Sequence, residues 1–302
     1  MSRRDPATGP NGIWIVDKPS GWTSHDVVAR ARKLLGTRKV GHAGTLDPMA
    51  TGVLVLGVGR ATRLLTFITG VDKDYEAVIR FGIETDSLDA DGEVTVRHDV
   101  DHLDVAAVTA AANELTGALS QVPPMVSAIK VDGRRLHQLA REGVEVERAP
   151  RPVHVERFDV APTDEPLVWT ASVRCSSGTY VRSLAADLGH ALGIGAHLAG
   201  LRRTRVGPFG IDEATELEHP VLLPMSAGVR HLPSVTVDAD IAAKVRHGRV
   251  LPVDPLFGDP GEAVDDGPWA VVDGDGDLLA VYQRNGVDRV KPAVVLADAQ
   301  AG

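Results

Sequence analysis

The chain has 302 residues, 43% of them hydrophobic, and a formal net charge of −9 at pH 7. This composition allows a sizeable core and excludes a chain dominated by disorder or by a coiled coil. Its single cysteine, Cys175, excludes an intramolecular disulfide. The N-terminus lacks the apolar run of a secretion signal, and no apolar stretch approaches the roughly 20 residues that span a bilayer. We therefore expect a cytoplasmic protein without a membrane partner.

The charge is unevenly distributed along the chain. Residues 1–70 carry a net charge of +6, whereas residues 231–302 carry −6. Between them, residues 174–205 hold five arginines against a single acid, Asp187. Because phosphates are contacted by local basic patches, the acidic total does not exclude RNA as a partner.

The first elements predicted in chain order are a strand, a helix and a second strand. The stretch "GIWIVDKPSG" is typical of a strand that ends in a Pro-Gly turn. Thr23 or Ser24 can then cap an amphipathic helix that stops at Gly36. A glycine-rich loop follows, and Val53 to Leu56 has the pattern of a buried strand.

Further along, strand-like and helix-like runs alternate. Strands are predicted at "YEAVIRF", "VHVERFDVA" and "LVWTASVRC", and helices at residues 104–115, 134–142 and 180–191. From about residue 231 the pattern changes to one short helix near 239–247 and three strand-like runs, "WAVVD", "LLAVY" and "PAVVLA". We therefore expect a mixed α/β domain over residues 1–230 and a small β-rich domain over 231–302, with Pro224 to Pro233 as the boundary.

Several cofactor motifs are incomplete. "LVLGVGRAT" resembles a dinucleotide-binding turn, but Thr62 stands at its third glycine position. "SLDADGE" resembles a calcium loop, but His98 stands where a bidentate Glu is needed. His98 and His102 have a metal-binding spacing without a third ligand. We expect no metal and no cofactor.

The stretch "GHAGTLDPMATGVLVLGVG" isolates one acid, Asp47, among glycines and small apolar residues. One interpretation is structural, because an Asp before a Pro commonly starts a turn and accepts backbone hydrogen bonds. The other is chemical: Gly41, Gly44 and Gly52 suit a backbone that bends sharply or lets another group approach closely. Residues on loops beside rigid strands often carry function.

The extended stretch "VGHAGTLDPMATGVLVLGVGRATRL" resembles the catalytic motif of the TruB-type tRNA pseudouridine synthases. Upstream, "IVDKPSGWTSHDVV" resembles the first motif of that family. Downstream, "DKDYEAVIRFG", "TDSLDADGE", "PPMVSAIKVDGRRLHQLAREG" and "SSGTYVRSLAADLG" resemble its later motifs in the same order. The resemblance covers roughly residues 12–205.

The resemblance implies a fold and a reaction. It implies a pseudouridine synthase core, with a central mixed and largely antiparallel sheet flanked by helices, and a small β-rich C-terminal domain of the PUA type. The reaction it implies is the isomerisation of uridine at position 55 in the T loop of tRNA, in which the N1–C1′ bond breaks, the base turns, and C5 bonds to C1′. Nothing is added or removed, which agrees with the missing cofactor motifs.

The resemblance also assigns roles to residues. Asp47 is implied as the nucleophile, a role that suits a carboxylate because a covalent intermediate divides one hard step into two. Arg182 is implied as its partner, since a neighbouring guanidinium favours the ionised carboxylate and fixes its direction. Tyr75 would stack on the flipped-out base. His42 would fill the space that this base vacates, Gly44 belongs to the bend, and Leu201 and Lys18 would form a pocket wall and a support for the turn.

RNA binding is expected at three basic groups. The first, on the predicted helix near residues 24–35 and the loop after it, comprises Arg30, Arg32, Lys33, Arg38 and Lys39. The second lies in a segment that resembles the mobile thumb of the family, about residues 124–152, and comprises Lys130, Arg134, Arg135 and Arg141. The third comprises Arg202, Arg203 and Arg205. Contacts of this kind set affinity without reading sequence. In the acidic C-terminal region, the net charge of −6 is unfavourable for binding phosphate, although Lys244, Arg246, Arg249, Arg284 and Lys291 can form one face.

The sequence therefore predicts an enzyme that acts on the T arm of tRNA as a monomer and without a guide RNA. Two alternatives remain open at this stage. The same surface could serve a non-catalytic tRNA chaperone, and "GVGRAT" could belong to a nucleotide-dependent oxidoreductase.

Overall fold

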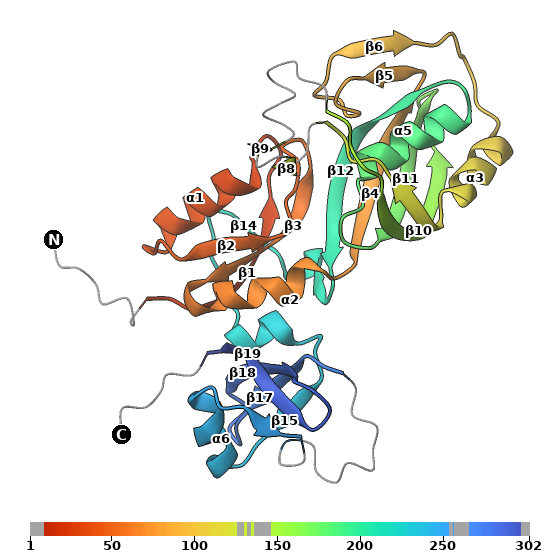
Figure 1. Cartoon of the computed structure of the whole chain (residues 1–302). Helices are drawn as coiled ribbons and strands as arrows, with labels where there is room; N and C mark the ends of the chain where they lie inside the picture. The colour runs from red at the N-terminus through yellow and green to blue at the C-terminus, as the bar shows by residue number, and fades with distance from the viewer. Residues whose placement is uncertain are drawn as a thin grey trace.

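The computed structural model describes residues 9–125, 130–131, 134–135, 146–253, 256 and 266–296. Its elements form a ten-stranded sheet with helices and a separate five-stranded sheet near the C-terminus (Figure 1). The mixed α/β class predicted from the sequence is confirmed. In the part of the chain described, no helix is long and apolar enough to cross a membrane.

The first half of the large sheet is built around β1 (Gly12–Lys18) and β3 (Thr51–Val58), which pair antiparallel along their whole length. The short strands β2 (Val40–Ala43) and β14 (Thr215–Glu216) pair with β3 and β1. Helix α1 (Ser24–Leu34) begins after Thr23, whose side chain forms a capping box with Asp26. The apolar face of α1 packs in one cluster with residues of β1 and β3.

The second half of the sheet consists of five strands in the order β12, β4, β11, β10 and β7. Their bounds are Ala196–Val206, Lys73–Phe81, Val168–Cys175, Arg151–Pro162 and Gly117–Gln121. These strands pair antiparallel. The two halves are joined by a short parallel pairing, Arg202 with Thr51 and Arg203 with Gly52. The sheet is therefore continuous but narrow at the point where the loop before β3 meets β12.

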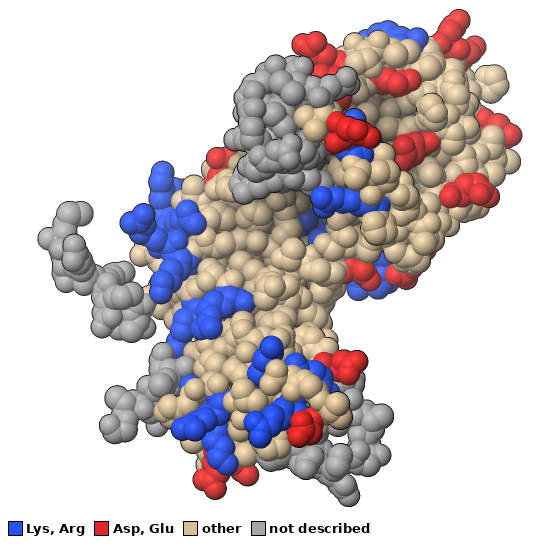
Figure 2. All heavy atoms as spheres, in the orientation of Figure 1, with Lys and Arg blue, Asp and Glu red and all other residues tan. Residues whose placement is uncertain are grey.

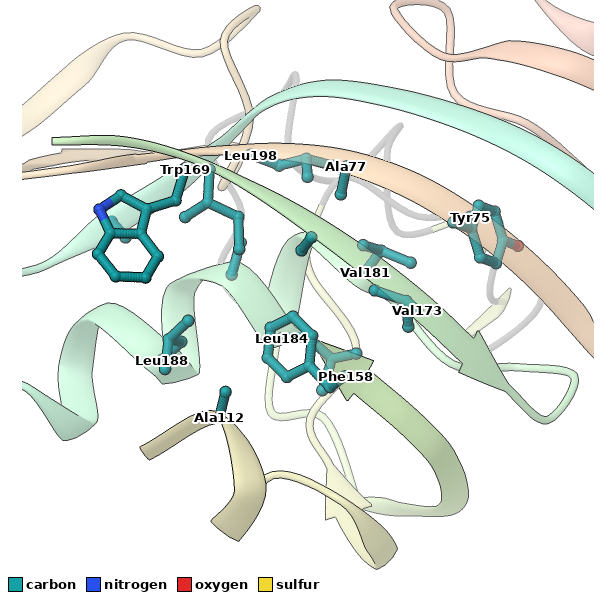
Figure 3. Close-up of a cluster of buried hydrophobic side chains, with 14 of the residues drawn as sticks. Tyr75, Ala77, Ala112, Phe158, Trp169, Val173, Val181, Leu184, Leu188 and Leu198 are labelled. Carbon is teal, nitrogen blue, oxygen red and sulfur yellow. The ribbon is translucent and has the colours of Figure 1, made fainter. Parts of the chain in front are cut away.

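Helices α3 (Val105–Glu114) and α5 (Val181–Ala191) pack against one face of this second half. Figure 3 shows Ala112 of α3 and Leu184 and Leu188 of α5 beside Phe158 of β10. Strand β4 alternates between buried and less buried residues, so Tyr75 and Ala77 point toward the helices. This alternation leaves Glu76 and Val78 on the opposite face.

Shorter elements connect these parts. After β3 come η1 (Gly59–Leu64) and α2 (Leu65–Thr69). Two small antiparallel pairs follow, β5 (Ile83–Thr85) with β6 (Val94–Arg97) and β8 (Lys130–Val131) with β9 (Arg134–Arg135), the last two strands having two residues each. The remaining short elements are β13 (Phe209–Gly210), η2 (Ile211–Glu213) and η3 (Met225–Val229).

The C-terminal sheet has the order β15, β17, β18, β19 and β16. The strand bounds are Ser234–Thr236, Trp269–Val272, Leu278–Arg284, Arg289–Val295 and Leu251–Pro252, and α6 (Ala239–Arg246) packs on them. Two arginines that follow β3 reach this sheet: Arg60 donates to the carbonyl of Leu296 at 2.9 Å and Arg63 to that of Val295 at 2.6 Å. The three strands and the short helix expected in this region are confirmed.

The helices expected near 104–115 and 180–191 are confirmed as α3 and α5. The helix expected over 134–142 is wrong at its start, because Arg134 and Arg135 are paired with β8 as a strand. Its remainder, and most of the central part of the predicted thumb, including Arg141, lie outside the described residues.

Candidate active site

Asp47 lies in the loop between β2 and β3, with its side chain 34% exposed. The loop turns sharply there, because the amide of Ala50 donates to the carbonyl of Asp47 at 3.1 Å. The carboxylate itself is free of this turn and faces a side chain from a distant element. The turn expected from the Asp-Pro sequence therefore exists, but the carboxylate does not cap it.

Residues at the end of β1 and at the start of α1 hold this loop in place. The buried Lys18 ammonium donates to the carbonyls of Pro19, Trp22 and Pro48 at 2.9, 2.7 and 3.1 Å. Burial lowers the pKa of Lys18 to about 8, with Asp47 opposing the shift. Ser24 accepts a hydrogen bond from the amide of Leu46 at 2.9 Å. Lys18 is thus placed as a support for the turn, as expected from the sequence.

Arg182 approaches Asp47 from the first turn of α5. Its Nε lies 2.9 Å from Oδ2 of Asp47, and its Nη2 donates to Oδ1 at 3.2 Å. This two-point contact fixes the direction of the carboxylate as well as its distance. Gln121 of β7 positions the start of the helix, because its amide group bonds both the N–H and the carbonyl of Tyr180.

A second acid contacts the other side of the same guanidinium. Asp89, 4% exposed, has Oδ2 at 3.2 Å from Nη1 of Arg182, and the carbonyl of Ser87 accepts from that nitrogen at 2.9 Å. The Asp89 carboxylate also accepts hydrogen bonds from the Ser87 hydroxyl and the Asp91 amide. Arg182 is therefore held between two carboxylates in a buried position.

The electrostatics of Asp47 reflect opposing effects. Burial raises the pKa of Asp47 above its ordinary value of 3.8, and Arg182 opposes this rise. Asp89 adds to the rise, whereas Lys18 also opposes it. Desolvation favours the protonated acid, so the cations are what make an ionised carboxylate attainable in this pocket.

A cavity of about 230 Å³ opens beside Asp47 and Arg182. Tyr75, Leu201 and Lys73 form part of its wall, together with the segment Ser177–Tyr180. Tyr75 is only 7% exposed, and burial raises the pKa of its phenol. The cavity thus combines one carboxylate with an aromatic ring and an apolar wall.

Arg203 supports the floor of this cavity. It is 1% exposed and donates to the carbonyls of Val53 at 2.8 Å, Gly44 at 3.2 Å and Thr45 at 3.4 Å. Gly44 has a φ of +80° and Gly52 a φ of +99°. A Cβ at Gly52 would lie 2.2 Å from the carbonyl oxygen of Arg203, so Gly52 is required by the approach of β12 to β3.

Lys73 lines the cavity, whereas His42 lies outside its lining, and the two residues differ in what they contact. Lys73 donates to the carbonyls of Val71 and Thr69 at 2.7 and 3.3 Å, and burial lowers its pKa to about 8. His42 lies on β2, with its ring centroid 5.6 Å from that of His25 in an edge-on arrangement. Burial lowers the pKa of His42, which favours its neutral form near neutral pH.

The structure brings together six of the residues singled out in the sequence. Asp47, Arg182, Tyr75, Gly44 and Leu201 line the same cavity, and Lys18 holds its loop. Arg202 lies elsewhere: it projects from the other face of β12 and pairs with Asp17 at 2.7 Å. Of Lys130 and Arg134, the structure describes only the backbone hairpin.

Three residues of the site were not assigned to it from the sequence: Asp89, Arg203 and Lys73. Arg203 was expected among the surface RNA contacts, but the structure buries it at 1% exposure against the carbonyls of the Asp47 loop and β3. Asp89 belongs to "SLDADGE", whose acids are typical of a turn, and Arg203 is one of three arginines in a basic run. Their roles depend on which face of a strand or turn they occupy. Only the motif around Tyr75, "DKDYEAV", carried a signal for Lys73.

The incomplete cofactor motifs serve local structure. A Cβ at Gly57 would lie 2.8 Å from the carbonyl oxygen of Ala61, so this glycine is needed for the turn of η1. His98 pairs with Glu84 at 2.7 Å. Among the residues that the structure describes, no group of three or more His, Cys, Asp or Glu side chains could hold a metal ion.

Comparison with known proteins places these features in a family. Residues 32–181 match the profile of the TruB family pseudouridylate synthase N-terminal domain, and residues 182–225 match that of the tRNA pseudouridylate synthase B C-terminal domain. The chain is 48% identical to "tRNA pseudouridine synthase B" of Arthrobacter sp. (strain FB24), over 95% of this chain and 97% of the relative. It is 47% identical to the protein of the same name from Thermobifida fusca, over 95% and 99%.

A solved structure described as a Cbf5-Nop10-Gar1 complex also matches. The TM-score is 0.72 at 26% identity, and the match covers 99% of this chain and 92% of that one. The sequence matches extend over almost the whole chain and include the loop of Asp47 and the helix of Arg182. The chain belongs to the TruB family of pseudouridylate synthases.

Proposed function

We propose that this chain converts uridine 55 in the T loop of tRNA to pseudouridine, with Asp47 as the nucleophile. Membership of the family supports the isomerisation of uridine in tRNA as the reaction class. The observation that carries the assignment to Asp47 is its two-point contact with Arg182 at the mouth of a cavity. Asp47 attacks C1′ or C6 of the bound nucleotide, the N1–C1′ bond breaks, and the base turns so that C5 bonds to C1′. The bond to Asp47 then breaks, C5 loses its proton, and N1 gains one.

Arg182 keeps the nucleophile charged and aimed. In a closed pocket the loss of water disfavours the carboxylate, and the guanidinium at 2.9 Å offsets this penalty. Because the contact uses both carboxylate oxygens, it also limits rotation of the Asp47 side chain. Asp89 and the Ser87 carbonyl fix the opposite side of Arg182, so they position the guanidinium without contacting the substrate.

Tyr75, Leu201 and His42 would receive the flipped-out nucleotide. The Tyr75 ring offers a flat surface on which a uracil can stack, and the Leu201 side chain adds apolar wall in the same cavity. Such a stack offsets part of the few kcal/mol that extrusion of the base requires. The neutral ring of His42, on β2 beside the loop, would occupy the space the base leaves.

The remainder of the tRNA would be bound by basic side chains around the site. Figure 2 shows lysine and arginine side chains gathered over α1 and over the C-terminal sheet. Lys33, Arg38 and Lys39 are exposed, whereas Arg30 pairs with Glu218 and Arg32 bonds the carbonyl of Val40. The exposed three are thus the better phosphate contacts in this group, and Lys130, Arg134 and Arg202 remain proposed contacts.

The organisation of the protein follows from the same proposal. Residues 1–230 would form the catalytic domain, with a thumb near 124–152, and residues 231–302 a PUA-like domain. Four lysines and arginines of that domain, Lys244, Arg249, Arg289 and Lys291, are exposed despite its acidic total. We expect the protein to work in the cytoplasm as a monomer, without a guide RNA, a metal or a cofactor.

The test is to map pseudouridine in unmodified tRNA after treatment with the wild-type chain and with Asp47→Asn. We expect modification at position 55 by the wild type and none by the variant. Modification at another position would overturn the proposed target. Equal product from both proteins would remove Asp47 from the chemistry, and no product from either would favour the chaperone.

A further inference from the structure

The tryptophans of this chain fall into two classes. Trp14, Trp169 and Trp269 are buried, with exposures of 0%, 3% and 2%. Trp22 is 37% exposed, and it is the only aromatic among the exposed large hydrophobic residues in the described part of the chain. Single apolar residues are common on protein surfaces, so what distinguishes Trp22 is the flat indole face that it presents next to the candidate active site.

Trp22 belongs to a short segment that is bonded directly to the catalytic loop. The Lys18 ammonium donates to the carbonyl of Trp22 at 2.7 Å and to that of Pro48, the residue after Asp47, at 3.1 Å. The amide of Gly21, the residue before Trp22, donates to the same Pro48 carbonyl at 2.8 Å. The backbone of Trp22 is therefore fixed relative to Asp47 while its side chain remains accessible.

A second aromatic feature follows on the same rim. His25, three residues after Trp22 and exposed, contacts His42 of β2 edge-on at 5.6 Å. The exposed basic residues Lys33, Arg38 and Lys39 lie at the other end of α1 and in the loop that follows it. The 11 residues of α1 place these cations about 16 Å from the aromatic residues, a separation of a few nucleotides. Surfaces that bind unpaired nucleotides combine both features, because bases stack on rings while phosphates contact charges.

Helix capping accounts for only part of Trp22. It directly precedes the N-cap Thr23, and an apolar residue there commonly packs against the fourth helical residue, here Val27. A leucine would satisfy that contact. The capping explanation therefore requires an apolar side chain at position 22 but not a partly exposed indole.

We infer that Trp22 is a stacking platform for an unpaired nucleobase of the tRNA loop that flanks the target uridine. This inference rests on the proposed function for the identity of the RNA. The pocket of Asp47 and Tyr75 holds the flipped-out base, and Trp22 holds a neighbour outside it. Stacking of this kind has little dependence on base identity, so it adds affinity and fixes the loop without reading sequence.

The direct experiment uses the fluorescence of Trp22 in an Asp47→Asn background, in which turnover cannot change the RNA. Emission from the three buried tryptophans is already shielded from acrylamide, so acrylamide quenching reports mainly on Trp22. We expect saturating unmodified tRNA to remove most of this quenching. In the Trp22→Leu, Asp47→Asn double variant, tRNA should leave the small residual quenching unchanged. If Trp22 stays equally accessible to acrylamide in the complex, the inference is wrong.

Affinity provides the second readout. Trp22→Leu keeps an apolar side chain before the helix but removes the ring, so we expect Kd for tRNA to rise roughly fivefold to 100-fold, as for loss of one base–aromatic stack. Trp22→Phe should restore most of the affinity, and Val105→Ala, an exposed apolar residue on α3, should leave it unchanged. Equal affinity of Trp22→Leu and wild type would contradict the inference.

Salt dependence separates stacking from charge. Lys33→Ala should reduce the slope of log Kd against log salt by about 1 if Lys33 contacts a phosphate, whereas Trp22→Leu should leave that slope unchanged. If the proposed reaction is wrong but the stacking role is right, no pseudouridine forms and tRNA still protects Trp22 from acrylamide. Pseudouridine formed while Trp22 remains accessible would overturn only the stacking role.

Discussion

Two Asp–Arg pairs in this protein have similar contact distances but very different surroundings. Asp47 and Arg182 meet at 2.9 Å beside a cavity of about 230 Å³, and the Arg182 side chain is 3% exposed. Asp17 and Arg202 meet at 2.7 Å at the edge of a larger hollow of about 670 Å³, with both side chains at least 33% exposed. In the first pair a second acid, Asp89, also contacts the arginine at 3.2 Å, and a buried lysine, Lys18, lies next to the aspartate.

This difference shows that neither the size of a cavity nor the presence of an Asp–Arg ion pair is enough to identify the catalytic site. The larger hollow lies over Glu76 and Val78, on the open face of β4, where water competes with every charge. The smaller cavity lies on the helix-covered face, where desolvation makes each charge expensive and each partner significant. The contrast also supplies matched controls, because the two pairs have the same chemistry.

Apart from Asp47 itself, the largest effect is expected at Arg182. Arg182→Met leaves Asp47 and Asp89 without their shared cation, so the free energy of unfolding should fall by about 3 to 5 kcal/mol and kcat/KM by at least about 100-fold. Arg182→Lys, which keeps the charge but loses the planar fork, should fold better and remain strongly impaired. Denaturant titration and pseudouridine assays measure both quantities, and near-normal activity of Arg182→Lys would contradict the aiming role.

A smaller effect is expected at Asp89, which acts through Arg182. Asp89→Asn keeps a carbonyl oxygen for hydrogen bonding but removes the charge, so the guanidinium is held less firmly. A displacement of about 1 Å in a positioning group can reduce kcat by about 100-fold. We therefore expect kcat to fall by up to this factor, and to fall more than KM rises. If only KM changes, the residue contacts RNA and does not position Arg182.

The effect of pH on kcat/KM should be small near neutral pH and steep at acid and alkaline pH. Activity requires ionised Asp47, whose pKa is raised by burial, so kcat/KM should fall about tenfold per pH unit once the pH drops below that raised pKa. On the alkaline side, Lys18 loses its proton near pH 8, which weakens the support of the Asp47 loop, and Lys73 in the cavity wall loses its proton in the same range. Unfolding measured over the same range is the control, and constant kcat/KM from about pH 4 to 9 would contradict this account.

The smallest effect is expected at Arg202. Arg202→Met removes an exposed ion pair, so the free energy of unfolding should change by less than about 1 kcal/mol. Single-turnover rates should stay within about twofold of the wild type, since Arg202 faces away from Asp47. A loss of tRNA affinity alone would place Arg202 in RNA binding, and a loss of the chemical rate would break the distinction between the two pairs.

Sequence reasoning found the parts of the site that lie within contiguous motifs. The resemblance led to Asp47, Arg182, Tyr75 and Leu201, and the structure brings these four together from four separate elements. The predicted strands and helices were confirmed wherever their apolar periodicity was strong, as in β3, β4 and α5.

The side-chain contacts that the sequence did not predict depend on the register in which the strands pair and on how distant segments meet in the fold. Arg202 and Arg203 are adjacent in the chain and equivalent in composition, yet the pairing of β12 with β3 and β4 directs one to the surface and the other under Gly44. Asp89 and Arg182 lie 93 residues apart in the chain, so their contact follows only from the fold. For the same reason, the basic run at residues 202–205 did not indicate that Arg203 is the arginine that supports the loop of Asp47.

The most direct test is a single-turnover comparison of Asp47→Asn with Asp17→Asn, using excess enzyme and unmodified tRNA. Both substitutions remove one carboxylate from an Asp–Arg pair and change the net charge equally. We predict no detectable pseudouridine from Asp47→Asn and a wild-type rate from Asp17→Asn, with both variants folded and binding tRNA. Product from Asp47→Asn at a rate similar to that of Asp17→Asn would show that the buried pair does not carry the chemistry.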